Sequence, residues 1–148
     1  MTTSGDRSAR ARVLVGGADA ELDVRLSGEL DAYNTAASGV DDQREFTVRA
    51  EDADGHPLAG LSGWTWGTCA GIAMVWVRED HRRGGLGGQL LAAAEQVSRE
   101  RGCTRLTVSS FTFQAPAFYE RYGFVETGRT EGLPVEGHAD VHFVKLLV

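Results

Sequence analysis

The sequence predicts an α/β (α+β) fold, in which a central mixed β-sheet of about six to seven strands is flanked by about three helices. Apolar residues recur at helical spacing in separate segments, and short β-rich runs lie between them. Several of these runs follow one another directly in the middle of the chain, where antiparallel hairpins are expected. Later runs are separated by helices, which allows parallel pairing, so the sheet should contain both kinds of pair.

The composition narrows the class of protein. The chain has 148 residues, of which 42% are apolar and 24% charged, with a net charge of −6. These values are typical of a soluble globular domain. No apolar run approaches the roughly 20 residues of a membrane helix, and the polar N-terminus lacks the apolar segment of a secretory signal. We therefore expect a disordered tail over residues 1–10, a single domain over 11–148 and a cytoplasmic location without membrane or nucleic-acid binding.

The first half of the chain begins with a short predicted strand over 12–15, which Gly16 and Gly17 end. Apolar residues spaced by three or four, from Leu22 to Tyr33, predict a helix over 21–37. Glycine-containing turns then separate β-like runs. These runs predict three strands, at 45–50, 58–66 and 72–77.

In the second half, a helix is expected from Gly85 to about Arg101, because its apolar residues share one face and Gly102 is a typical C-terminal residue. Glu95 and Arg99 form an i, i+4 pair on this helix. The remaining predicted elements are a strand at 104–110, a helix at 115–122 and strands at 124–130 and 139–147.

A basic, glycine-dense loop joins the strand that ends at Val77 to the helix that begins near Gly85. Glycines allow a ligand to approach the backbone, and the free N–H groups and dipole at a helix start favour an anion. Arg82 and Arg83 add positive charge beside them. The loop lacks the Gly-Lys-Ser/Thr ending of a Walker motif and the third glycine of a dinucleotide motif, so it predicts another kind of phosphate ligand.

Two segments resemble a known family. The loop reads R-x-x-G-x-G over residues 82–87, and a second segment reads A-x-x-F-Y-E-x-x-G-F over 115–124. Together, in this order and at this separation, they resemble the GNAT superfamily of acetyl-CoA-dependent N-acetyltransferases. The resemblance extends from about Glu21 to the C-terminus. That fold usually has two helices before its first long hairpin, and one of them is missing from the predicted elements.

The resemblance implies acetyl-CoA as the co-substrate and assigns roles to matching positions. Tyr119 would be the general acid for the thiolate, and the backbone N–H of Val77 would polarise the thioester carbonyl. Many family members have an asparagine seven positions before the tyrosine, where this chain has Thr112; either Thr112 or Gln114 would replace it. The expected cofactor-binding residues are Val75, Trp76, Val77, Arg82, Arg83, Gly84, Gly85, Leu86, Gly87, Gly88 and Thr112.

The general base and the acceptor site are less sharply indicated. A base must take a proton from the amine, and carboxylates and imidazoles suit this task. His138 is the first candidate, and the others are Asp140, His142 and Glu45. Trp64 and Trp66 share one strand face, which indicates either core packing or an aromatic wall for a cationic acceptor. The residues proposed for acceptor binding are Tyr33, Asn34 and Trp66.

Three functions fit these observations. The first is acetyl transfer to a primary amine of a small molecule by direct attack in a ternary complex. The second is acetylation of a protein or peptide, and the third is a non-catalytic acyl-CoA-binding module. The only cysteines, Cys69 and Cys103, are too few for a zinc site, so no metal is expected. The resemblance also implies a homodimer, formed through the apolar strand over 141–147.

Overall fold

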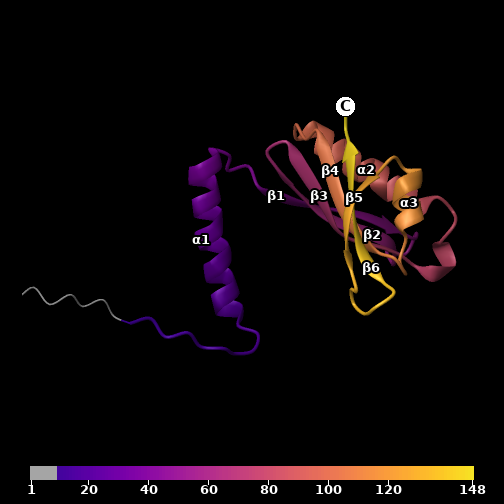
Figure 1. Ribbon diagram of the computed structural model, residues 1–148. Helices are drawn as coiled ribbons and strands as arrows, with labels where there is room; N and C mark the ends of the chain where they lie inside the picture. The colour runs from indigo at the N-terminus through magenta and orange to yellow at the C-terminus, as the bar shows by residue number, and fades with distance from the viewer. Residues whose placement is uncertain (1–9) are drawn as a thin grey trace, which may run out of the picture. The chain divides into compact units, whose positions relative to one another are not determined.

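The computed structural model describes residues 10–148 (Figure 1). The chain divides into two compact units, the first ending at Gly39 and the second running from Val40 to Val148. Within the described residues, no helix is both long enough and apolar enough to cross a membrane. The predicted disordered tail over 1–10 lies almost wholly outside the described residues.

The first unit contains helix α1 (Ala20–Ser38). Asp19 caps its start, because its Oδ1 accepts the N–H of Leu22 at 3.0 Å. Gly39 ends the helix with φ 73°, and its N–H donates to Thr35 O at 2.8 Å. The helix predicted over 21–37 is thus confirmed. The strand predicted over 12–15 is wrong: these residues are irregular, because a strand needs a partner and no strand among residues 10–148 pairs with them.

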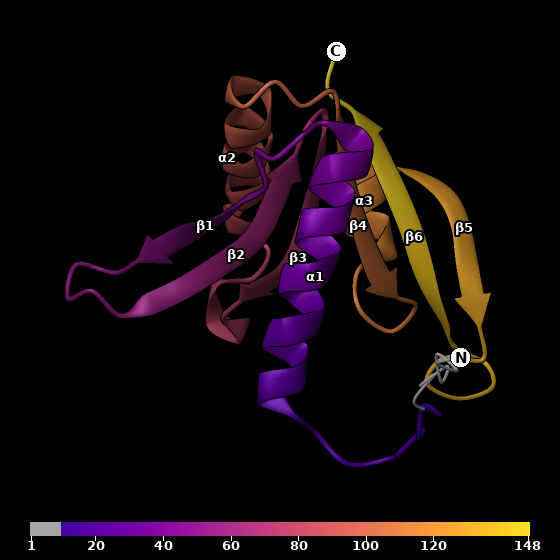
Figure 2. The same ribbon diagram turned by 90° about the vertical axis from the view of Figure 1, so that its left-hand side faces the viewer.

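The second unit is a six-stranded sheet with two α-helices and a short 3-10 turn. The strands follow the order β1-β2-β3-β4-β6-β5, which can be traced across Figure 2. β3 and β4 pair parallel and all other neighbours pair antiparallel, so the predicted mixed sheet is confirmed. The elements are β1 (Arg44–Glu51), β2 (Pro57–Trp66), β3 (Cys69–Val77), η1 (Glu79–His81), α2 (Leu86–Glu100), β4 (Arg105–Phe111), α3 (Pro116–Arg121), β5 (Val125–Glu131) and β6 (Ala139–Leu146).

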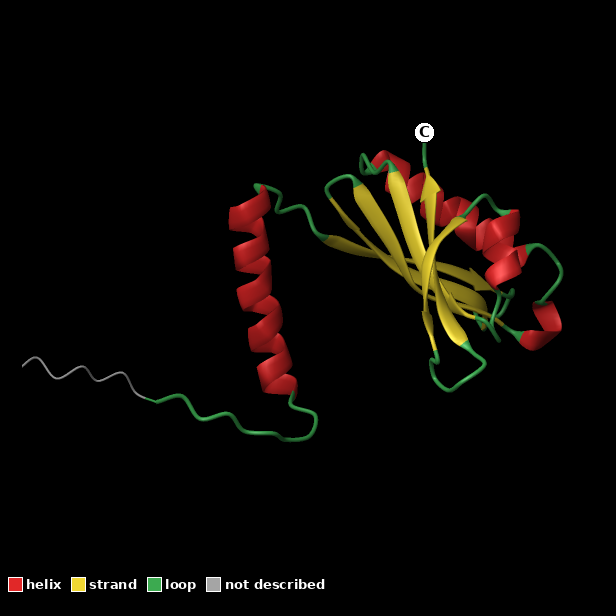
Figure 3. Cartoon of the chain, in the orientation of Figure 1, coloured by secondary structure: helices red, strands yellow, loops and turns green. Residues whose placement is uncertain are grey.

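Both helices of this unit cover the same face of the sheet (Figure 3). Along β2 the odd-numbered residues are buried and the even-numbered ones are more exposed, as expected for a strand with one covered face. The core between helices and sheet is built from alternate strand residues and the apolar side of α2. Its largest fully buried apolar side chains are Phe143, Leu90, Leu91, Leu106 and Val141.

β3 and β4 separate after a short stretch of pairing. Their parallel register covers only Cys69–Gly71 opposite Arg105–Thr107. A register shift between Ser62 and Gly63 of β2 lies opposite the point where β3 leaves β4. Such irregularities bend a strand and increase its twist. The C-terminal halves of β3 and β4 therefore diverge, and their facing edges are left open.

β6 lies between β4 and β5, and the edge strands of the sheet are β1 and β5. Both long edges of β6 are therefore hydrogen-bonded within the unit. Whether the strand over 141–147 is swapped with, or abuts, its counterpart in a dimer is not tested by this pairing within one chain. The dimer itself stays a prediction.

An ion pair fastens α2 to β6. Glu95 is a buried residue, and its Oε1 accepts a hydrogen bond from Lys145 Nζ while its Oε2 accepts from Arg99 at 3.2 Å. The predicted pair between Glu95 and Arg99 is thus confirmed, and Lys145 was not foreseen. Lys145 also lies over the Phe124 ring, 6.0 Å from its centroid.

Replacing Glu95 with alanine should destabilise the fold by about 3 kcal/mol, because Lys145 is left with an unpaired charge in a half-buried site. Urea denaturation followed by circular dichroism measures the change. Glu100→Ala is the matched control on the same helix: Glu100 is exposed, and its loss should change the free energy of unfolding by no more than about 0.5 kcal/mol. Equal effects of the two variants would contradict a stabilising role for the ion pair.

Candidate active site

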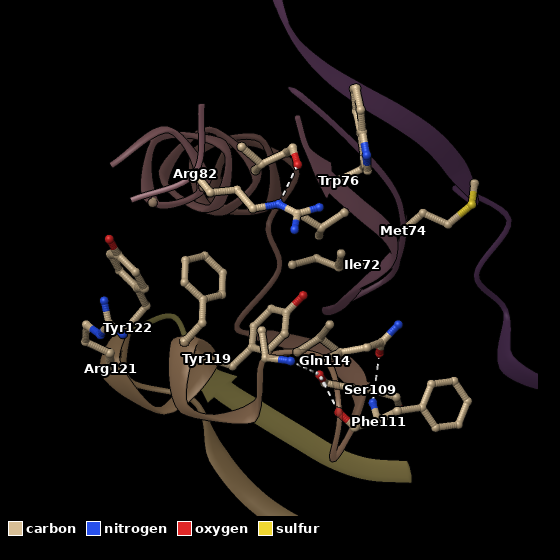
Figure 4. Close-up of a pocket in the computed structure, with 18 of the residues that line it drawn as sticks. Ile72, Met74, Trp76, Arg82, Ser109, Phe111, Gln114, Tyr119, Arg121 and Tyr122 are labelled. Carbon is tan, nitrogen blue, oxygen red and sulfur yellow. Dashed lines mark hydrogen bonds between the residues drawn. The ribbon is translucent and has the colours of Figure 1, made fainter. Parts of the chain in front are cut away.

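A cavity of about 1050 Å³ occupies the opening between β3 and β4 (Figure 4). Its walls come from the C-terminal half of β3, the loop and first turn of α2, the end of β4, and α3. One side faces α2 and α3, and the other opens on the opposite face of the sheet, which no helix of the second unit covers (the uncovered face). Of the residues expected to bind the donor, eight line this cavity: Val75, Trp76, Val77, Arg82, Arg83, Gly85, Gly87 and Gly88.

The start of α2 presents uncapped backbone donors to the cavity. Gly85 is the residue before the helix, with φ 84°, and no side chain caps this end. The first helical bond runs from the N–H of Gln89 to Gly85 O, so the N–H groups of Leu86, Gly87 and Gly88 have no acceptor within the helix. Free N–H groups and the helix dipole together favour an anion here.

Glycine is also required in this turn for packing. A Cβ at Gly88 would lie 2.3 Å from the hydroxyl of Tyr122, and one at Gly87 would lie 3.0 Å from the ring of Phe118. Both aromatic residues belong to the second motif. The two motifs that the sequence places about 30 residues apart are therefore in direct contact across the helices α2 and α3. Gly84 and Leu86 complete the turn but do not line the cavity.

Positive charge surrounds the helix-facing side of the cavity. Arg82, Arg83 and Arg121 all line it. Arg83 has φ 68°, which is unusual for a residue with a side chain and indicates local strain. Arg82 Nε donates to Val77 O at 2.9 Å, so its guanidinium reaches back along the end of β3 (Figure 4).

Charged side chains stabilise the turn η1, which precedes this loop. Arg78 donates to both carboxylate oxygens of Asp80, at 2.6 and 2.9 Å, and His81 Nδ1 lies 3.0 Å from the same carboxylate. The Arg78 hydrogen bonds, followed by the one from His81, hold the pKa of Asp80 well below its usual range. Asp80 thus stays ionised at neutral pH and orients the chain that enters the phosphate-binding turn.

The open edge of β3 points backbone groups into the cavity. The N–H of Arg78 donates to Leu58 O at 2.8 Å, toward β2. Successive residues of a strand direct their N–H and C=O groups to opposite sides, so those of Val77 and Val75 point toward the gap where β4 has departed. The carbonyl of Val77 accepts from Arg82, which agrees with this direction. The N–H of Val77 therefore faces the cavity, as its predicted role requires.

Tyr119 projects from α3 with its hydroxyl directed to the centre of the cavity (Figure 4). The ring is 7% exposed and packs edge-on against Phe118 and Phe124, with centroids 5.2 and 5.6 Å away. Among residues 10–148 no group hydrogen-bonds the phenol. Burial raises the pKa of Tyr119, so the hydroxyl stays protonated at neutral and mildly alkaline pH.

Of the two residues that could replace the family's asparagine, Gln114 lines the cavity and Thr112 does not. Thr112 does not line the cavity: its hydroxyl accepts the N–H of Ala139 at 3.2 Å, and its own N–H donates to Ala139 O at 2.9 Å. Gln114 does line it. Its Oε1 accepts the N–H of Phe111 at 2.8 Å, which leaves the amide nitrogen directed into the space toward Met74 (Figure 4).

The side of the cavity on the uncovered sheet face has a different chemistry. Met74 and Trp76 of β3 are 70% and 50% exposed, and both line the cavity. Phe111 stacks on Phe113 with centroids 5.2 Å apart. Asp140, at the start of β6, also lines this side and is half-buried. The cavity is therefore basic toward the helices, and apolar with one carboxylate toward the open face.

The candidate bases lie in different places. Asp140 lines the cavity, whereas His138 contacts the ring of Phe113 and the Thr112 hydroxyl outside it. Glu45 is an exposed residue of β1, paired with Trp64 across the strands. His142 lines a smaller hollow of about 330 Å³ and lies beside Ser109, which lines both spaces. The role given to His138 stays a prediction.

The acceptor residues named from the sequence are divided between the two units. Trp66 does not line it, and its indole N–H donates to Val40 O at 3.2 Å. Core packing was the favoured interpretation of Trp64, but this residue lies against Gly71 and is 39% exposed. Tyr33 and Asn34 belong to α1 in the first unit. Their role in acceptor binding stays a prediction.

Sequence reasoning missed several cavity residues that strand alternation could have indicated. Ser109 and Phe111 alternate with the buried Val108 and Ser110 along β4, and so share the uncovered face. Met74 and Trp76 do the same along β3. No pattern in the sequence predicts that β3 and β4 separate. It is this separation that lets all four side chains line the same cavity.

Two groups with reactive or ligating atoms lie away from the cavity. Neither Cys69 nor Cys103 lines it, and burial raises the pKa of both thiols. Asp52, Asp54 and His56 bring their ligand atoms within 4.8 Å of one another in the β1–β2 turn. There Asp52 already accepts the N–H groups of Asp54 and His56, each at 2.9 Å, which accounts for the cluster as a turn-stabilising arrangement.

Comparison with known proteins agrees with this site. The model of the acetyltransferase (GNAT) family matches residues 19–124. An acetyltransferase of Agrobacterium fabrum is 34% identical over 111 residues, covering 75% of this chain and 81% of the relative. A blasticidin-S acetyltransferase of Streptomyces morookaense is 34% identical over 125 residues, covering 84% and 79%.

Solved structures share the fold. The crystal structure of an acetyltransferase from Agrobacterium tumefaciens superposes with a TM-score of 0.84 at 31% identity, covering 93% of this chain and 99% of that one. A streptothricin acetyltransferase from Bacillus anthracis, solved with acetyl coenzyme A, is similar in fold, with a TM-score of 0.61 at 21% identity and coverage of 69% and 62%. The chain belongs to the GNAT acetyltransferase family, and the predicted enzyme class and fold are confirmed.

Proposed function

We propose that the protein transfers the acetyl group of acetyl-CoA to a primary amine of a small, cationic molecule by direct attack in a ternary complex. The observation that carries this proposal is the two-sided chemistry of the cavity between β3 and β4. Arginines and free backbone donors line the side toward α2, and Asp140 with apolar side chains lines the side on the uncovered face. A polyanionic donor and a cationic acceptor can thus enter from opposite sides.

The donor side fits acetyl-CoA in three respects. The N–H groups at the start of α2 and the nearby guanidinium of Arg83 suit a pyrophosphate. The open edge of β3 can pair with the amide groups of the pantetheine arm, as an added strand would. The N–H of Val77 is then directed at the thioester carbonyl, where it would stabilise the oxyanion that forms on attack. Gln114 supplies a further donor in place of the family's asparagine.

Transfer itself needs a proton donor for the leaving thiolate, and Tyr119 fits this role. The amine nitrogen forms a bond to the carbonyl carbon, the carbon–sulfur bond breaks, and the thiolate takes the proton of the Tyr119 hydroxyl. A phenol whose pKa is raised by burial is protonated when the thiolate leaves. Neither cysteine lies at the cavity, which supports direct transfer rather than an acetylated thiol of the protein.

The acceptor side favours a small cation. Asp140 provides a carboxylate for an ammonium group, and the exposed Trp76 and the stacked pair Phe111 and Phe113 offer faces for a cation or a flat ring. Two relatives carry the names blasticidin-S acetyltransferase and streptothricin acetyltransferase, and both names describe acetylation of antibiotics. A basic, antibiotic-like amine is therefore the class of acceptor that we propose first.

The test is release of CoA thiol from acetyl-CoA in the presence of single amines. The panel contains blasticidin S, streptothricin, simple diamines and a lysine-containing peptide. We expect kcat/KM for at least one small cationic amine to exceed that for the peptide at least tenfold, and initial rates to give the intersecting lines of a ternary complex. A higher kcat/KM for the peptide would favour protein acetylation. Acetyl-CoA binding without turnover on any amine would favour a non-catalytic binding module.

The quaternary state and location belong to the same proposal. We propose a homodimer, as the sequence resemblance implies, and we propose that it acts in the cytoplasm. Unless β6 is swapped between subunits, the dimer contact would involve β5, β1 or a helix surface, because both edges of β6 are paired. Light scattering at the working concentration tests the dimer, and a strict monomer would contradict it.

A further inference from the structure

A hydroxyl and an imidazole meet on the uncovered face of the sheet. Ser109 of β4 and His142 of β6 are directly opposite each other in the antiparallel register. Ser109 Oγ lies 2.9 Å from His142 Nδ1. On its other side, His142 Nε2 lies 3.2 Å from Thr130 Oγ1 of β5. The imidazole is thus held between two hydroxyls that come from the two neighbouring strands.

This pair connects the reaction cavity to a second hollow. Ser109 lines the main cavity with Tyr119 and Asp140, and it also lines the smaller hollow in which His142 lies. Figure 4 shows Ser109 on the β4 wall with Phe111, across the cavity from Met74 and Trp76. A proton that leaves the cavity through the Ser109 hydroxyl therefore reaches an imidazole that itself borders a separate opening.

The two contacts of the imidazole fit an arrangement of protons that suits a relay. Thr130 Oγ1 can accept from Nε2–H, and Nδ1 is then the unprotonated nitrogen that accepts from the Ser109 hydroxyl. In this arrangement the Ser109 oxygen keeps a lone pair free toward the cavity. In other enzymes too, a hydrogen bond to one ring nitrogen fixes the tautomer of the imidazole, so that the other nitrogen can receive a hydroxyl proton.

We propose that Ser109 and His142 form the proton relay that deprotonates the acceptor amine. This inference rests on the proposed N-acetyl transfer. Ser109 is the catalytic residue, since its Oγ takes a proton from the ammonium while its own proton passes to Nδ1 of His142, a positioning residue. The neutral amine then attacks the thioester. Solvent in the smaller hollow then removes this first proton from His142. After the attack the amine nitrogen loses a second proton, and this proton restores the phenol of Tyr119, which has given its own proton to the thiolate.

The surroundings of His142 contain little competing charge. Asp140, two residues earlier on β6, lies on the same face of the strand as His142. On β4 the nearest charged group on that face is Arg105, four residues from Ser109. The charged residues of β5 pair with the buried positions of β6 and so lie on the other face, leaving Thr127 and Thr130 toward His142.

The first test is NMR of the wild-type protein with ¹⁵N-labelled histidine, which needs no substrate. The relay requires His142 to be protonated on Nε2 and bare on Nδ1 at neutral pH, and Ser109→Ala should shift the Nδ1 signal. An unprotonated Nε2 with a protonated Nδ1 would overturn the relay, because Ser109 would then accept a hydrogen bond from the imidazole instead of donating one.

The second test is the kinetics of Ser109→Ala and His142→Gln with an amine that the wild-type protein acetylates. Each variant should lower kcat/KM for the amine by about 100-fold at neutral pH, the lower range for loss of a general base, with KM for acetyl-CoA unchanged within about twofold. The acid limb of the wild-type pH profile should disappear in both. The double variant should be no slower than the slower single variant, since the two groups act as one unit.

Matched variants separate this relay from its competitors. His56→Gln makes the same substitution in the β1–β2 turn, far along the chain from the cavity, and should leave kcat/KM unchanged. His138→Gln tests the base first named from the sequence: a loss there, with His142→Gln fully active, would overturn the relay. A wild-type protein that acetylates no amine would overturn the proposed function and the relay with it. The NMR test needs no substrate, so it shows separately whether Ser109 donates its hydrogen bond to His142.

Discussion

Replacing Tyr119 with phenylalanine is expected to lower kcat by about 10²–10⁴-fold, the range typical for loss of a general acid. The phenyl ring preserves the packing against Phe118 and Phe124, so the free energy of unfolding and the Kd for acetyl-CoA should barely change. Thiol-release kinetics and calorimetric titration measure the two quantities. Tyr122→Phe removes a hydroxyl from the residue that directly follows the same short helix and should lower kcat less than tenfold. A Tyr119→Phe enzyme with wild-type kcat would contradict the acid role.

The pH dependence of kcat tests the role of the Tyr119 hydroxyl independently. Burial raises the pKa of Tyr119 above its ordinary value of about 10, so the phenol remains protonated where a free tyrosine would begin to ionise. An alkaline limb of kcat that belongs to Tyr119 should therefore lie above pH 10. The same shift affects the free energy of unfolding. Because Tyr119 ionises at a lower pH in the unfolded chain than in the folded one, its contribution to stability is intact below about pH 10 and is lost as the pH rises further.

The Gly85→Glu variant should bind acetyl-CoA on the order of 100-fold more weakly, a loss of about 2.7 kcal/mol. Two effects act together. The residue has φ 84°, a left-handed conformation that side chains other than asparagine rarely adopt, so the turn must distort. The added carboxylate also stands at the start of α2, where the free N–H groups are expected to hold the phosphates of the donor.

Gly85→Asn is the matched control for this prediction. Asparagine tolerates the left-handed region, is a favourable residue at the start of a helix and carries no charge. A Cβ at Gly85 has no neighbour within 4 Å, so steric conflict with the protein is not expected. Calorimetric titration should show a loss of affinity below about tenfold for Gly85→Asn. Equal affinities of the Glu and Asn variants would contradict the placement of the phosphates at this turn.

Most secondary structure could be predicted because it depends on local signals. The helix α2 and its glycine ends follow from apolar spacing and from Gly85 and Gly102, and the observed bounds differ from the prediction by a single residue at each end. The strand predicted over 12–15 failed for the opposite reason. Its few β-prone residues carry the local signal, but strand formation depends on a partner that the sequence does not specify.

The candidate site could be predicted only in part. The two motifs indicated Tyr119 and the phosphate-binding turn, because each role depends on residues close together in the sequence. The Ser109–His142 contact joins residues 33 positions apart and depends on the register of β4 and β6. The exposure of Trp64 and Trp76 depends on which sheet face the helices cover. Neither register nor coverage has a local signal, so these features required the structure.

Thermal melting of the wild-type protein tests whether the opening between β3 and β4 binds acetyl-CoA. A ligand at 100 times its Kd should stabilise the folded state by about 2.7 kcal/mol, which raises the melting temperature by several degrees. We predict such a rise with acetyl-CoA and with CoA, and little or none with ATP at the same concentration. No rise with acetyl-CoA, or an equal rise with ATP, would show that this opening is not an acetyl-CoA site.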